Sequence, residues 1–329
     1  MTRILVTGAN GFVGRELSRT LLARGYDVRA SVRQLGEHGA GHISNIADTV
    51  SVGDIGAGTD WLHALKDVDT VIHLAARVHV MQEISKNPLE SFRSVNVHGT
   101  ERLARMAIER GVTRFVYISS ISIHGNSSGD RAYAEEDDVQ PHSPYAVSKW
   151  EGELVLRTIE EESDLEVVIV RPPLVYGAGV GGNFLRLMQW AQKGFPLPLK
   201  SIQNKRSFIG IENLADLLES CVSNPAAAGE TFVASDGEDL STPDLIDRVA
   251  KLMGQSARLI SVPVSVLRAI GKVVGKEAVL DRLCNSLRVD ASKARTLLGW
   301  QPRISLDEGL ARTVKWYVEQ IADGGVCAR

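Results

Sequence analysis

The stretch that decides the fold is RILVTGANGFVG, residues 3–14. A short run of branched apolar residues, 4–7, leads directly into Gly8, Gly11 and Gly14, and a helical pattern follows. Glycines at this spacing permit a tight turn, and they let a pyrophosphate approach the backbone amides at a helix N-terminus, where the helix dipole favours negative charge. The stretch therefore predicts a dinucleotide-binding turn between a first strand and a first helix.

Short β-branched runs alternate with amphipathic helical patterns through the first half of the chain. The runs lie at 27–32, 49–52, 70–75, 114–119 and 167–171, and the longest helical patterns at 11–23, 88–110 and 144–162. This alternation predicts an α/β fold with a Rossmann-type, doubly wound parallel sheet covered by helices on both faces. We place the dinucleotide-binding domain at residues 1–172 and about 203–235. A smaller, mostly helical C-terminal lobe would take 173–202 and 236–329 and bind the substrate.

Composition excludes several classes of protein. The 329 residues include 37 Lys and Arg against 40 Asp and Glu, so the formal charge of -3 shows no electrostatic footprint for nucleic acid or an anionic membrane. The apolar runs are strand-sized and the start lacks a signal peptide's apolar stretch, so we expect a cytoplasmic protein without membrane insertion. Cys221, Cys284 and Cys327 are far apart and lack metal-ligand spacing, so we predict neither a disulfide nor a metal site.

One helical pattern, around 264–280, carries Arg268, Lys272 and Lys276 on one face. Three basic residues are few for stable anchoring to a membrane. We therefore interpret this stretch as an ordinary surface helix.

The end of the second predicted strand bears on the type of cofactor. NAD sites usually place an acidic residue there, which hydrogen-bonds the ribose 2′-hydroxyl. Here the strand ends Ser31-Val32-Arg33. Val32 offers no such bond, whereas Ser31 and Arg33 could hold a 2′-phosphate through charge-assisted hydrogen bonds. The sequence thus favours NADP(H), with NAD(H) as the alternative if Arg33 is merely solvated.

Tyr145 and Lys149 lie four residues apart in a predicted helix that Ser143 and Pro144 begin. Spacing of four puts both side chains on one face. Because a nearby ammonium favours the phenolate, we expect Lys149 to lower the pKa of Tyr145 and make it a usable acid and base. Ser120 follows a predicted strand at the sheet edge where such folds bind ligands, so it would hydrogen-bond the same substrate oxygen. Ser120, Tyr145 and Lys149 are the predicted catalytic residues.

Together these motifs resemble the extended short-chain dehydrogenase/reductase family over nearly the whole chain. The matching residues are GANGFVG at 8–14, Asp54-Ile55, HLAA at 73–76, Asn96, Ser119-Ser120, YAVSK at 145–149 and RPPLVYG at 171–177. The resemblance implies that Asp54 and Ile55 flank the adenine, that Ala75 and Ala76 line the cofactor, and that Asn96 supports the site. The nicotinamide would lie between Tyr145 and the loop after Arg171. The cofactor-binding residues expected in all are Gly8, Asn10, Gly11, Phe12, Val13, Gly14, Ser31, Arg33, Asp54, Ile55, Leu74, Ala75, Ala76, Asn96, Tyr145, Lys149 and Pro172.

Family members that act on nucleotide sugars resemble this chain further. Asn183 opens a helix after a glycine-rich loop, and Arg206 lies in the turn at 204–207. Both resemble ligands of a nucleotide diphosphate, a dianion that a helix N-terminus and a guanidinium bind well. Arg282 or Arg288 would add a third contact. The resemblance implies a UDP-sugar substrate held by Ser120, Ser122, Asn183, Arg206 and Arg282.

The stretches 204–207, 235–242 and 286–290 are similar to bacterial O-antigen enzymes described as UDP-glucose 4-epimerases, some of which are UDP-N-acetylquinovosamine dehydrogenases. This similarity implies a role in lipopolysaccharide synthesis, with reduction of UDP-4-dehydro-6-deoxy-N-acetylglucosamine at C4 to UDP-N-acetylquinovosamine. The alternative is 4-epimerisation of UDP-glucose or UDP-N-acetylglucosamine. A hypothesis of another class is a non-catalytic, dinucleotide-sensing regulator on the same fold.

The chain departs from the family pattern at four positions. Dehydratases carry an Asp-Glu pair after the catalytic hydroxyl residue, whereas this chain has Ile121 and Ser122, so we expect no dehydration. His124 stands where a tyrosine is usual, and Leu174 where an asparagine is frequent. We interpret His124 as structural because Tyr145 already supplies the acid. The family commonly forms homodimers through the two helices expected here at 88–110 and 144–162.

Overall fold

The computed structural model describes residues 2–35, 46–78 and 87–322. Its main sheet has seven strands in the order β3-β2-β1-β4-β5-β6-β9, all parallel, as the alternating pattern predicted. The order reverses at β1 and β4, and such a switch point is where open α/β sheets bind ligands. The strands are β1 (Arg3–Thr7), β2 (Asp27–Val32), β3 (Asp48–Ser51), β4 (Thr70–His73), β5 (Arg114–Ile118), β6 (Glu166–Arg171) and β9 (Thr231–Val233).

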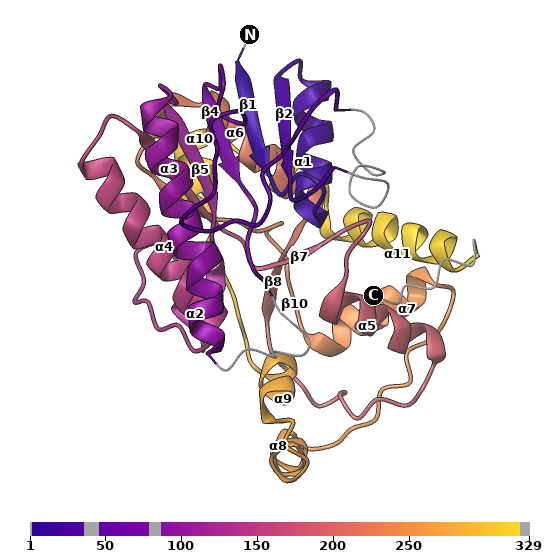
Figure 1. The fold of residues 1–329 in the computed structure, drawn as a ribbon. Helices are drawn as coiled ribbons and strands as arrows, with labels where there is room; N and C mark the ends of the chain where they lie inside the picture. Colours follow the sequence, from indigo (N-terminus) through magenta and orange to yellow (C-terminus); the bar gives the residue numbers. More distant parts are fainter. Residues whose placement is uncertain (1, 36–45, 79–86, 323–329) are drawn as a thin grey trace.

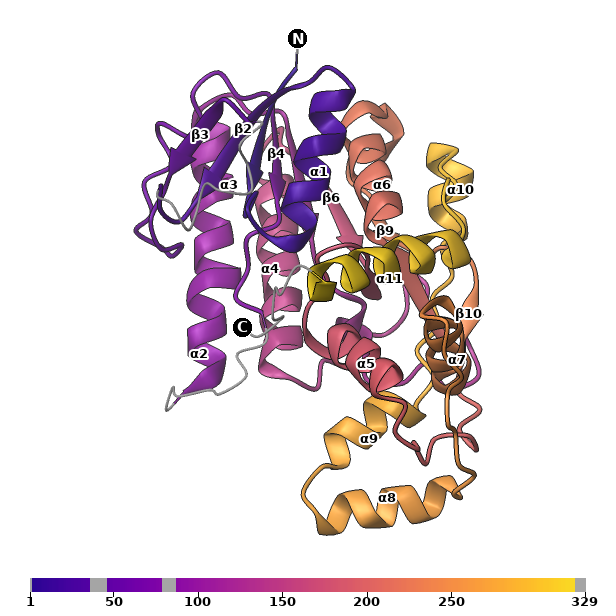
Figure 2. The same ribbon diagram turned by 90° about the vertical axis from the view of Figure 1, so that its right-hand side faces the viewer.

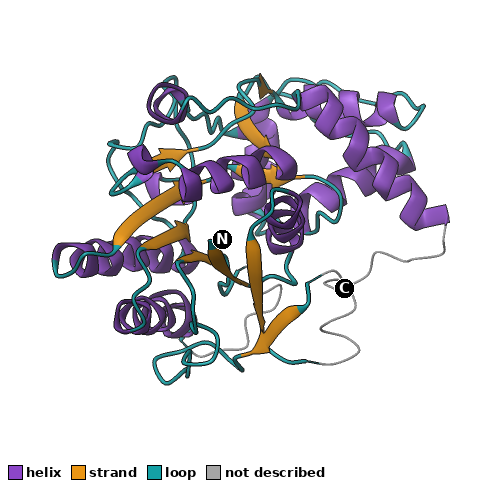
Figure 3. Cartoon of the chain, turned by 90° about the horizontal axis from the view of Figure 1, so that it is seen from above, coloured by secondary structure: helices purple, strands orange, loops and turns teal. Residues whose placement is uncertain are grey.

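Helices cover both faces of this sheet (Figures 1 and 3). On one face α1 (Phe12–Ala23) and α6 (Ile211–Ser223) share a core with Ile4 and Val6 of β1. On the other face α3 (Thr100–Glu109) and α4 (Pro144–Glu161) share a core with Leu5 of the same strand. Successive side chains of a strand point to opposite faces, so an unbroken apolar run such as 4–6 supplies both cores.

The helix predicted at 88–110 is interrupted. It consists of α2 (Pro88–Arg93), a π-helical turn η1 (Ser94–Gly99) and α3. A π turn admits one extra residue per turn and commonly marks a functional site. Two 3₁₀ turns, η2 (Ile121–His124) and η3 (Pro225–Ala227), complete the first domain.

The second lobe is built around a small sheet in the order β10-β8-β7 and a group of helices (Figure 2). Its strands are β7 (Leu174–Tyr176), β8 (Arg206–Gly210) and β10 (Asp239–Leu240). Its helices are α5 (Gly182–Lys193), α7 (Thr242–Leu252), α8 (Val264–Val273), α9 (Glu277–Cys284) and α11 (Leu306–Ala322). The pattern at 264–280 is therefore two helices, separated at Gly275, whose φ of +66° suits glycine.

The two parts of the chain interleave. Of the segment 203–235, predicted to belong to the first domain, β9 returns to the main sheet beside β6, whereas β8 pairs with β7 and β10 in the small sheet. The helix α10 (Ser292–Leu298) was assigned to the second lobe from the sequence, yet Ala294 and Trp300 pack in the core of the large sheet. Trp300 also donates a 2.9 Å hydrogen bond from Nε1 to Asp216 on α6. The chain thus passes from the second lobe to the main sheet at α10 and returns to the second lobe at α11.

In the described ranges, no helix is long and apolar enough to cross a bilayer. The same ranges contain no group of three or more His, Cys, Asp or Glu arranged to hold a metal ion. Cys221 is buried and Cys284 is partly buried, and both are free thiols. Cys327 lies outside the described residues.

Two buried arginines tie inner strands of the main sheet to neighbouring segments in the same way. Arg29 pairs with Asp48 on the adjacent strand at 2.8 Å, and its Nη1 donates to the carbonyls of His63, Ala64 and Lys66. Arg114 pairs with Glu166 on the adjacent strand, and its Nη1 donates to the carbonyls of residues 221, 222 and 224 at the end of α6. Each guanidinium satisfies carbonyls that a helix or turn end leaves without partners.

We expect Arg114→Met to lower the free energy of unfolding by about 2–4 kcal/mol, because it leaves one buried and two partly buried carbonyls, and Glu166, without their donor. Urea unfolding followed by circular dichroism measures this change. Arg105→Met is the matched control, since Arg105 is half-exposed and pairs with Glu101 on its own helix; it should cost less than about 0.5 kcal/mol. Equal losses in the two variants would contradict the role of Arg114.

Candidate active site

A groove of about 1790 Å³ runs along the carboxyl ends of β1, β2 and β4. It is lined by the predicted glycine-rich turn and by the ends of these strands. Gly11 begins α1 without a side-chain cap, and the first turn of the helix contains no acidic residue. The first amides of α1 are therefore available to an anion, and the helix dipole favours one there.

The glycines of the turn are required by close contacts. Gly8 has a φ of +65°, and a Cβ on it would lie 3.0 Å from the backbone of Ala75. A Cβ on Gly14 would lie 2.2 Å from the carbonyl oxygen of Gly8. Side chains at these positions would separate β1, α1 and the turn after β4. This cradle fits the pyrophosphate of a dinucleotide, and its predicted lining residues Gly8, Asn10, Gly11, Phe12, Val13 and Gly14 all border the groove.

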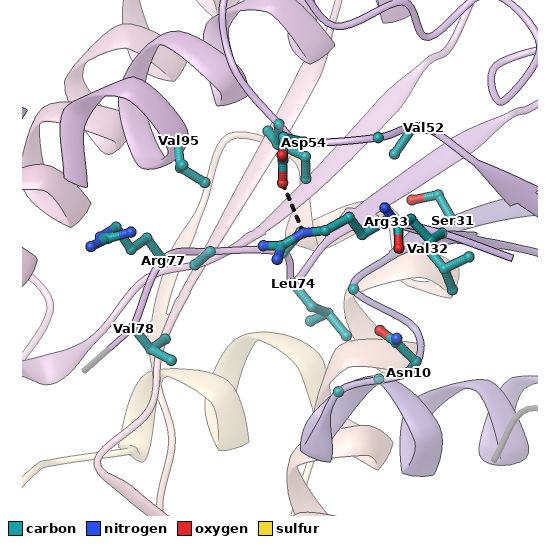
Figure 4. A pocket seen from close by; sticks show the side chains of 18 of the residues that line it. Asn10, Ser31, Val32, Arg33, Val52, Asp54, Leu74, Arg77, Val78 and Val95 are labelled. Atoms are coloured by element: carbon teal, nitrogen blue, oxygen red, sulfur yellow. Dashed lines mark ion pairs between the residues drawn. The ribbon is translucent and has the colours of Figure 1, made fainter. Parts of the chain in front are cut away.

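An exposed ion pair lines the end of the groove beside β2. Arg33 Nε lies 2.9 Å from Asp54 Oδ1, and both side chains are mostly exposed (Figure 4). Ser31 and Ile55 line the same end, and Ile55 also packs against Gly99 of η1. The residue predicted to hold a 2′-phosphate therefore already pairs with the residue expected to flank the adenine. A 2′-phosphate would have to share the Arg33 guanidinium with Asp54.

The turn after β4 is fixed by a chain of hydrogen bonds through the buried His73. Thr7 Oγ1 accepts from the backbone N–H groups of Leu74 and Ala75, and it lies 2.8 Å from His73 Nδ1. His73 Nε2 lies 3.1 Å from Thr100 Oγ1, which donates to the Asn96 carbonyl. Burial, with a smaller effect of Lys149, lowers the pKa of His73 to about 3, so the ring is neutral. The chain thus holds Leu74, Ala75 and Ala76 against the groove.

Asn96 is buried in η1 and supports the same turn. Its Oδ1 accepts from the backbone N–H of Arg77 at 2.8 Å. Its Nδ2 donates to the Arg77 carbonyl and to Ser148 Oγ on α4. Asn96 therefore links the turn after β4 directly to the helix that carries Tyr145 and Lys149.

Ser120, Tyr145 and Lys149 come together at the ends of β5 and α4. Ser143 caps α4 through its Oγ, which accepts from the N–H of Ala146 at 3.1 Å, so Tyr145 lies in the first turn as predicted. The Ser120 hydroxyl hydrogen-bonds the Tyr145 phenol. Lys149 is buried, and its Nζ lies 3.8 Å from the centre of the Tyr117 ring. Ser122 joins the group through a 2.9 Å contact between its Oγ and that of Ser120.

The pKa of Tyr145 differs from the predicted one. Burial raises the pKa of Tyr145 to about 12, and the hydrogen bond from Ser120 only partly opposes it. Burial also lowers the pKa of Lys149 to about 7, opposed by the negative charge of Glu153. The prediction that Lys149 lowers the Tyr145 pKa is wrong for this environment, because desolvation disfavours both charged forms. At neutral pH the phenol is protonated and can donate a proton.

A buried ion pair that sequence reasoning missed joins α4 to the end of β6. Arg171 donates to Glu153 from Nε and Nη2, with a shortest distance of 2.6 Å. Its Nη1 donates to the Glu135 carbonyl and to His124 Nε2. Glu153 falls in the buried stripe of α4 with Ala146, Lys149, Leu156 and Ile159. A carboxylate buried in such a stripe requires a buried cation. The helical spacing of Glu153 from these apolar residues is the sequence signal that indicates such a pair.

His124 has both ring nitrogens engaged by protein groups, as a structural histidine requires. Nε2 accepts from Arg171, and Nδ1 lies 3.2 Å from the Asp138 carbonyl. Burial and the neighbouring Arg171 lower its pKa. Pro172 is buried after β6, and its carbonyl accepts from the N–H of Ile121, next to Ser120.

The residues expected to hold a diphosphate are partly assembled. Arg206 begins β8 and donates from Nη1 to the carbonyls of Arg282 and Asn285. Burial and the like charge of Arg282 lower the pKa of Arg206, so two guanidinium groups are close together. Arg288 instead pairs with Asp239 at 2.8 Å, so of the two alternatives for the third contact Arg282 is the one beside Arg206. Asn183 is exposed at the start of α5.

Comparison with known proteins gives matches along nearly the whole chain. Residues 4–234 match the model of the NAD dependent epimerase/dehydratase family. A UDP-glucose 4-epimerase of Vibrio cholerae is 40% identical over 321 residues, covering 96% of this chain and 95% of that protein. A UDP-glucuronic acid 4-epimerase of Bacillus cereus, solved in complex with NAD, has a TM-score of 0.79 at 26% identity and covers 97% and 99% of the two chains. A dTDP-glucose 4,6-dehydratase of Streptomyces venezuelae, solved with NAD and TYD bound, has a TM-score of 0.78 at 27% identity, with 98% of each chain covered.

We expect Lys149 to titrate near pH 7, because burial disfavours its ammonium form. In a protein labelled with ¹³C at the lysine ε-carbons, one signal should shift with a midpoint near pH 7. That signal should be missing from Lys149→Met, which assigns it. A Lys149 signal that shifts only above about pH 10, the range of an unperturbed lysine, would contradict the burial argument.

Proposed function

Since this chain belongs to the NAD dependent epimerase/dehydratase family, we propose that it is an oxidoreductase acting at C4 of a UDP-sugar. The family and the enzymatic character expected from the motifs are both confirmed by the matches. The observation that carries the proposal is the cluster of Ser120, Tyr145 and Lys149, whose helix α4 is linked through Asn96 to Arg77 at the border of a groove that fits a dinucleotide. In particular we propose reduction of UDP-4-dehydro-6-deoxy-N-acetylglucosamine to UDP-N-acetylquinovosamine, as in O-antigen synthesis.

A nicotinamide dinucleotide bound in the groove would supply the hydride. Tyr145 would give its phenolic proton to the oxygen at C4, and its raised pKa keeps that proton in place at neutral pH. Ser120, already hydrogen-bonded to Tyr145, would hydrogen-bond the same oxygen. Lys149, with a pKa of about 7, would bind the nicotinamide ribose and could return a proton to Tyr145.

The diphosphate of the substrate would bind the cationic site of the second lobe. Arg206 and Arg282 lie together, and a dianion between them would relieve their mutual repulsion. Asn183 at the start of α5 would add an amide contact, and Ser122 would contact the sugar beside Ser120. Ile121 and Ser122 provide no carboxylate, so dehydration is not part of the proposal.

The second candidate is 4-epimerisation of UDP-glucose or UDP-N-acetylglucosamine. The Vibrio cholerae relative is named as a UDP-glucose 4-epimerase, and the Bacillus cereus structure holds NAD. The pairing of Arg33 with Asp54 also favours NAD, because it leaves the guanidinium less available to a 2′-phosphate. Val32 in place of an acidic residue favours NADP(H) and net reduction. A catalytically idle regulator would bind a dinucleotide but convert no nucleotide sugar.

The deciding experiment mixes the purified protein with UDP-4-dehydro-6-deoxy-N-acetylglucosamine and follows nicotinamide absorbance with NADPH and NADH separately. Stoichiometric loss of reduced cofactor supports the reductase and gives its cofactor preference. UDP-glucose and UDP-N-acetylglucosamine are incubated in parallel, and galacto-isomers without net cofactor loss would establish the epimerase instead. Arg33→Ala should weaken NADPH use more than NADH use if Arg33 holds the 2′-phosphate.

We expect Tyr145→Phe to lower kcat by about 10²–10⁴-fold while dinucleotide affinity changes little, because the phenol supplies a proton rather than binding energy. Lys149→Ala should lose both affinity and rate. Steady-state kinetics and dinucleotide titration separate the two effects. Tyr26→Phe, a substitution in the turn between α1 and β2, is the control and should keep full activity. Retained activity in Tyr145→Phe would refute the assignment.

We also propose a homodimer through α2, η1 and α4. A shallow depression between these elements is lined by Val97, Leu154 and Val155, and Leu154 is half-exposed. The Arg93–Glu151 ion pair holds the two elements together as one face. We expect Leu154→Arg to convert the dimer to a monomer, because the symmetric contact would bring two buried cations together. Sedimentation velocity measures this, and a parent protein that sediments as a monomer would refute the proposal.

A further inference from the structure

Two neighbouring segments at the end of the second lobe combine charges of one sign with exposed apolar side chains, whereas α9, which packs against α8, also carries Glu277 and Asp281. We define the basic tip as residues 193–205 and 255–276. These two segments contain seven Lys and Arg residues and no Asp or Glu, in a chain whose acidic residues outnumber the basic ones. All seven side chains are exposed, namely Lys193, Lys200, Lys205, Arg258, Arg268, Lys272 and Lys276. The net charge of the whole chain conceals this segregation.

The two segments of the basic tip form one surface. Leu197 exchanges backbone hydrogen bonds of 2.8 Å with Arg258 and Ile260, and the N–H of Lys200 donates to the Ile260 carbonyl. Beneath them Leu199, Ile202, Ile246 and Leu267 make a small core that anchors α8. Lys and Arg residues that are distant in the sequence therefore lie on one surface with a common apolar core.

The helix α8 lies across the extremity of this unit. Figures 1 and 2 show it at the end of the molecule farthest from the N-terminus, end-on in one view and lengthwise in the other. Leu267 and Gly271 face inward and are buried. Val266, Ile270 and Val273 follow one another at helical spacing on the outside, and Val273 is 87% exposed. Phe195, Ile260 and Val274 are further exposed apolar side chains of the basic tip.

Its three basic residues alone predicted that the stretch 264–280 is an ordinary surface helix, but the structure gathers four further cations beside it. We propose that the basic tip is a peripheral docking surface for a bilayer that contains anionic phospholipid. Its cations complement anionic headgroups, and each basic residue near such a surface adds to the attraction. The outer valines and isoleucine of α8 would enter the boundary between headgroups and acyl chains, as in helices that lie in the membrane plane. The contact would be reversible, because the apolar stripe is short and no described helix can span the bilayer.

The catalytic residues lie outside this surface. Tyr145 and Lys149 are on α4, in the first domain, and α4 contributes no residue to the core beneath the basic tip. Docking would therefore leave the catalytic helix free while it holds the second lobe at the membrane. The proposal does not depend on which sugar the enzyme converts.

Sedimentation with sucrose-loaded vesicles tests the proposal in the full-length protein. We expect binding to vesicles of phosphatidylcholine with phosphatidylglycerol, weak binding to phosphatidylcholine alone, and loss of binding at high salt. Lys272→Glu with Lys276→Glu, and separately Val266→Asp with Val273→Asp, should each weaken the partition by about tenfold or more. The activity of both variants in vesicle-free solution should equal that of the parent.

Matched controls come from α11, where Lys315 and Val318 are comparably exposed. Lys315→Glu with Val318→Asp should leave vesicle binding unchanged. The proposal is overturned if the parent does not bind the anionic vesicles, or if the α8 variants bind as well as the parent. It is also overturned if Val266→Asp with Val273→Asp reduces the oligomeric state in vesicle-free solution, because the surface would then be an interface between copies of the chain.

Discussion

The buried ion pair between Arg171 and Glu153 fixes the position of α4, the helix that carries Tyr145 and Lys149. The two side chains are almost fully shielded from water, so their desolvation must be offset by a complete set of hydrogen bonds. Arg171 meets that demand by donating to Glu153, to the Glu135 carbonyl and to His124. Any rotation of α4 would leave a buried charge uncompensated. The pair thus holds Lys149, one turn away on the same stripe, in a single orientation.

An uncharged hydrogen-bond network fixes the position of the turn after β4, which borders the groove. Thr7 Oγ1 accepts two backbone N–H bonds, so its own proton points to His73 Nδ1 and the ring donates from Nε2 to Thr100. The low pKa of His73 keeps this arrangement uncharged. Asn96 extends it to Ser148 on α4. An uncharged network thus positions the turn after β4, and a charged pair positions α4, within the same part of the interior.

Local patterns in the sequence predict the structural features that interactions between residues close along the chain determine. The glycines at 8, 11 and 14, the cap at Ser143 and the spacing of Tyr145 and Lys149 predict the sheet, the cradle and the catalytic group. Contacts between distant residues, such as Arg33 with Asp54, leave no periodic signal. The π turn at Asn96 likewise arises from tertiary hydrogen bonds rather than from helix propensity. The pKa of Tyr145 was mispredicted because the sequence shows its partner Lys149 but not the burial of both groups.

The second lobe carries its own electrostatic constraint. Arg206 is partly withdrawn from water beside Arg282, an arrangement that destabilises its charged form. Carbonyls of Arg282 and Asn285 nevertheless hold the Arg206 guanidinium in place. A site that is strained by like charges and rigidly held is preorganised for an anion, because binding relieves the repulsion without ordering new side chains. The like charges that destabilise this part of the lobe would therefore strengthen its binding of the proposed diphosphate.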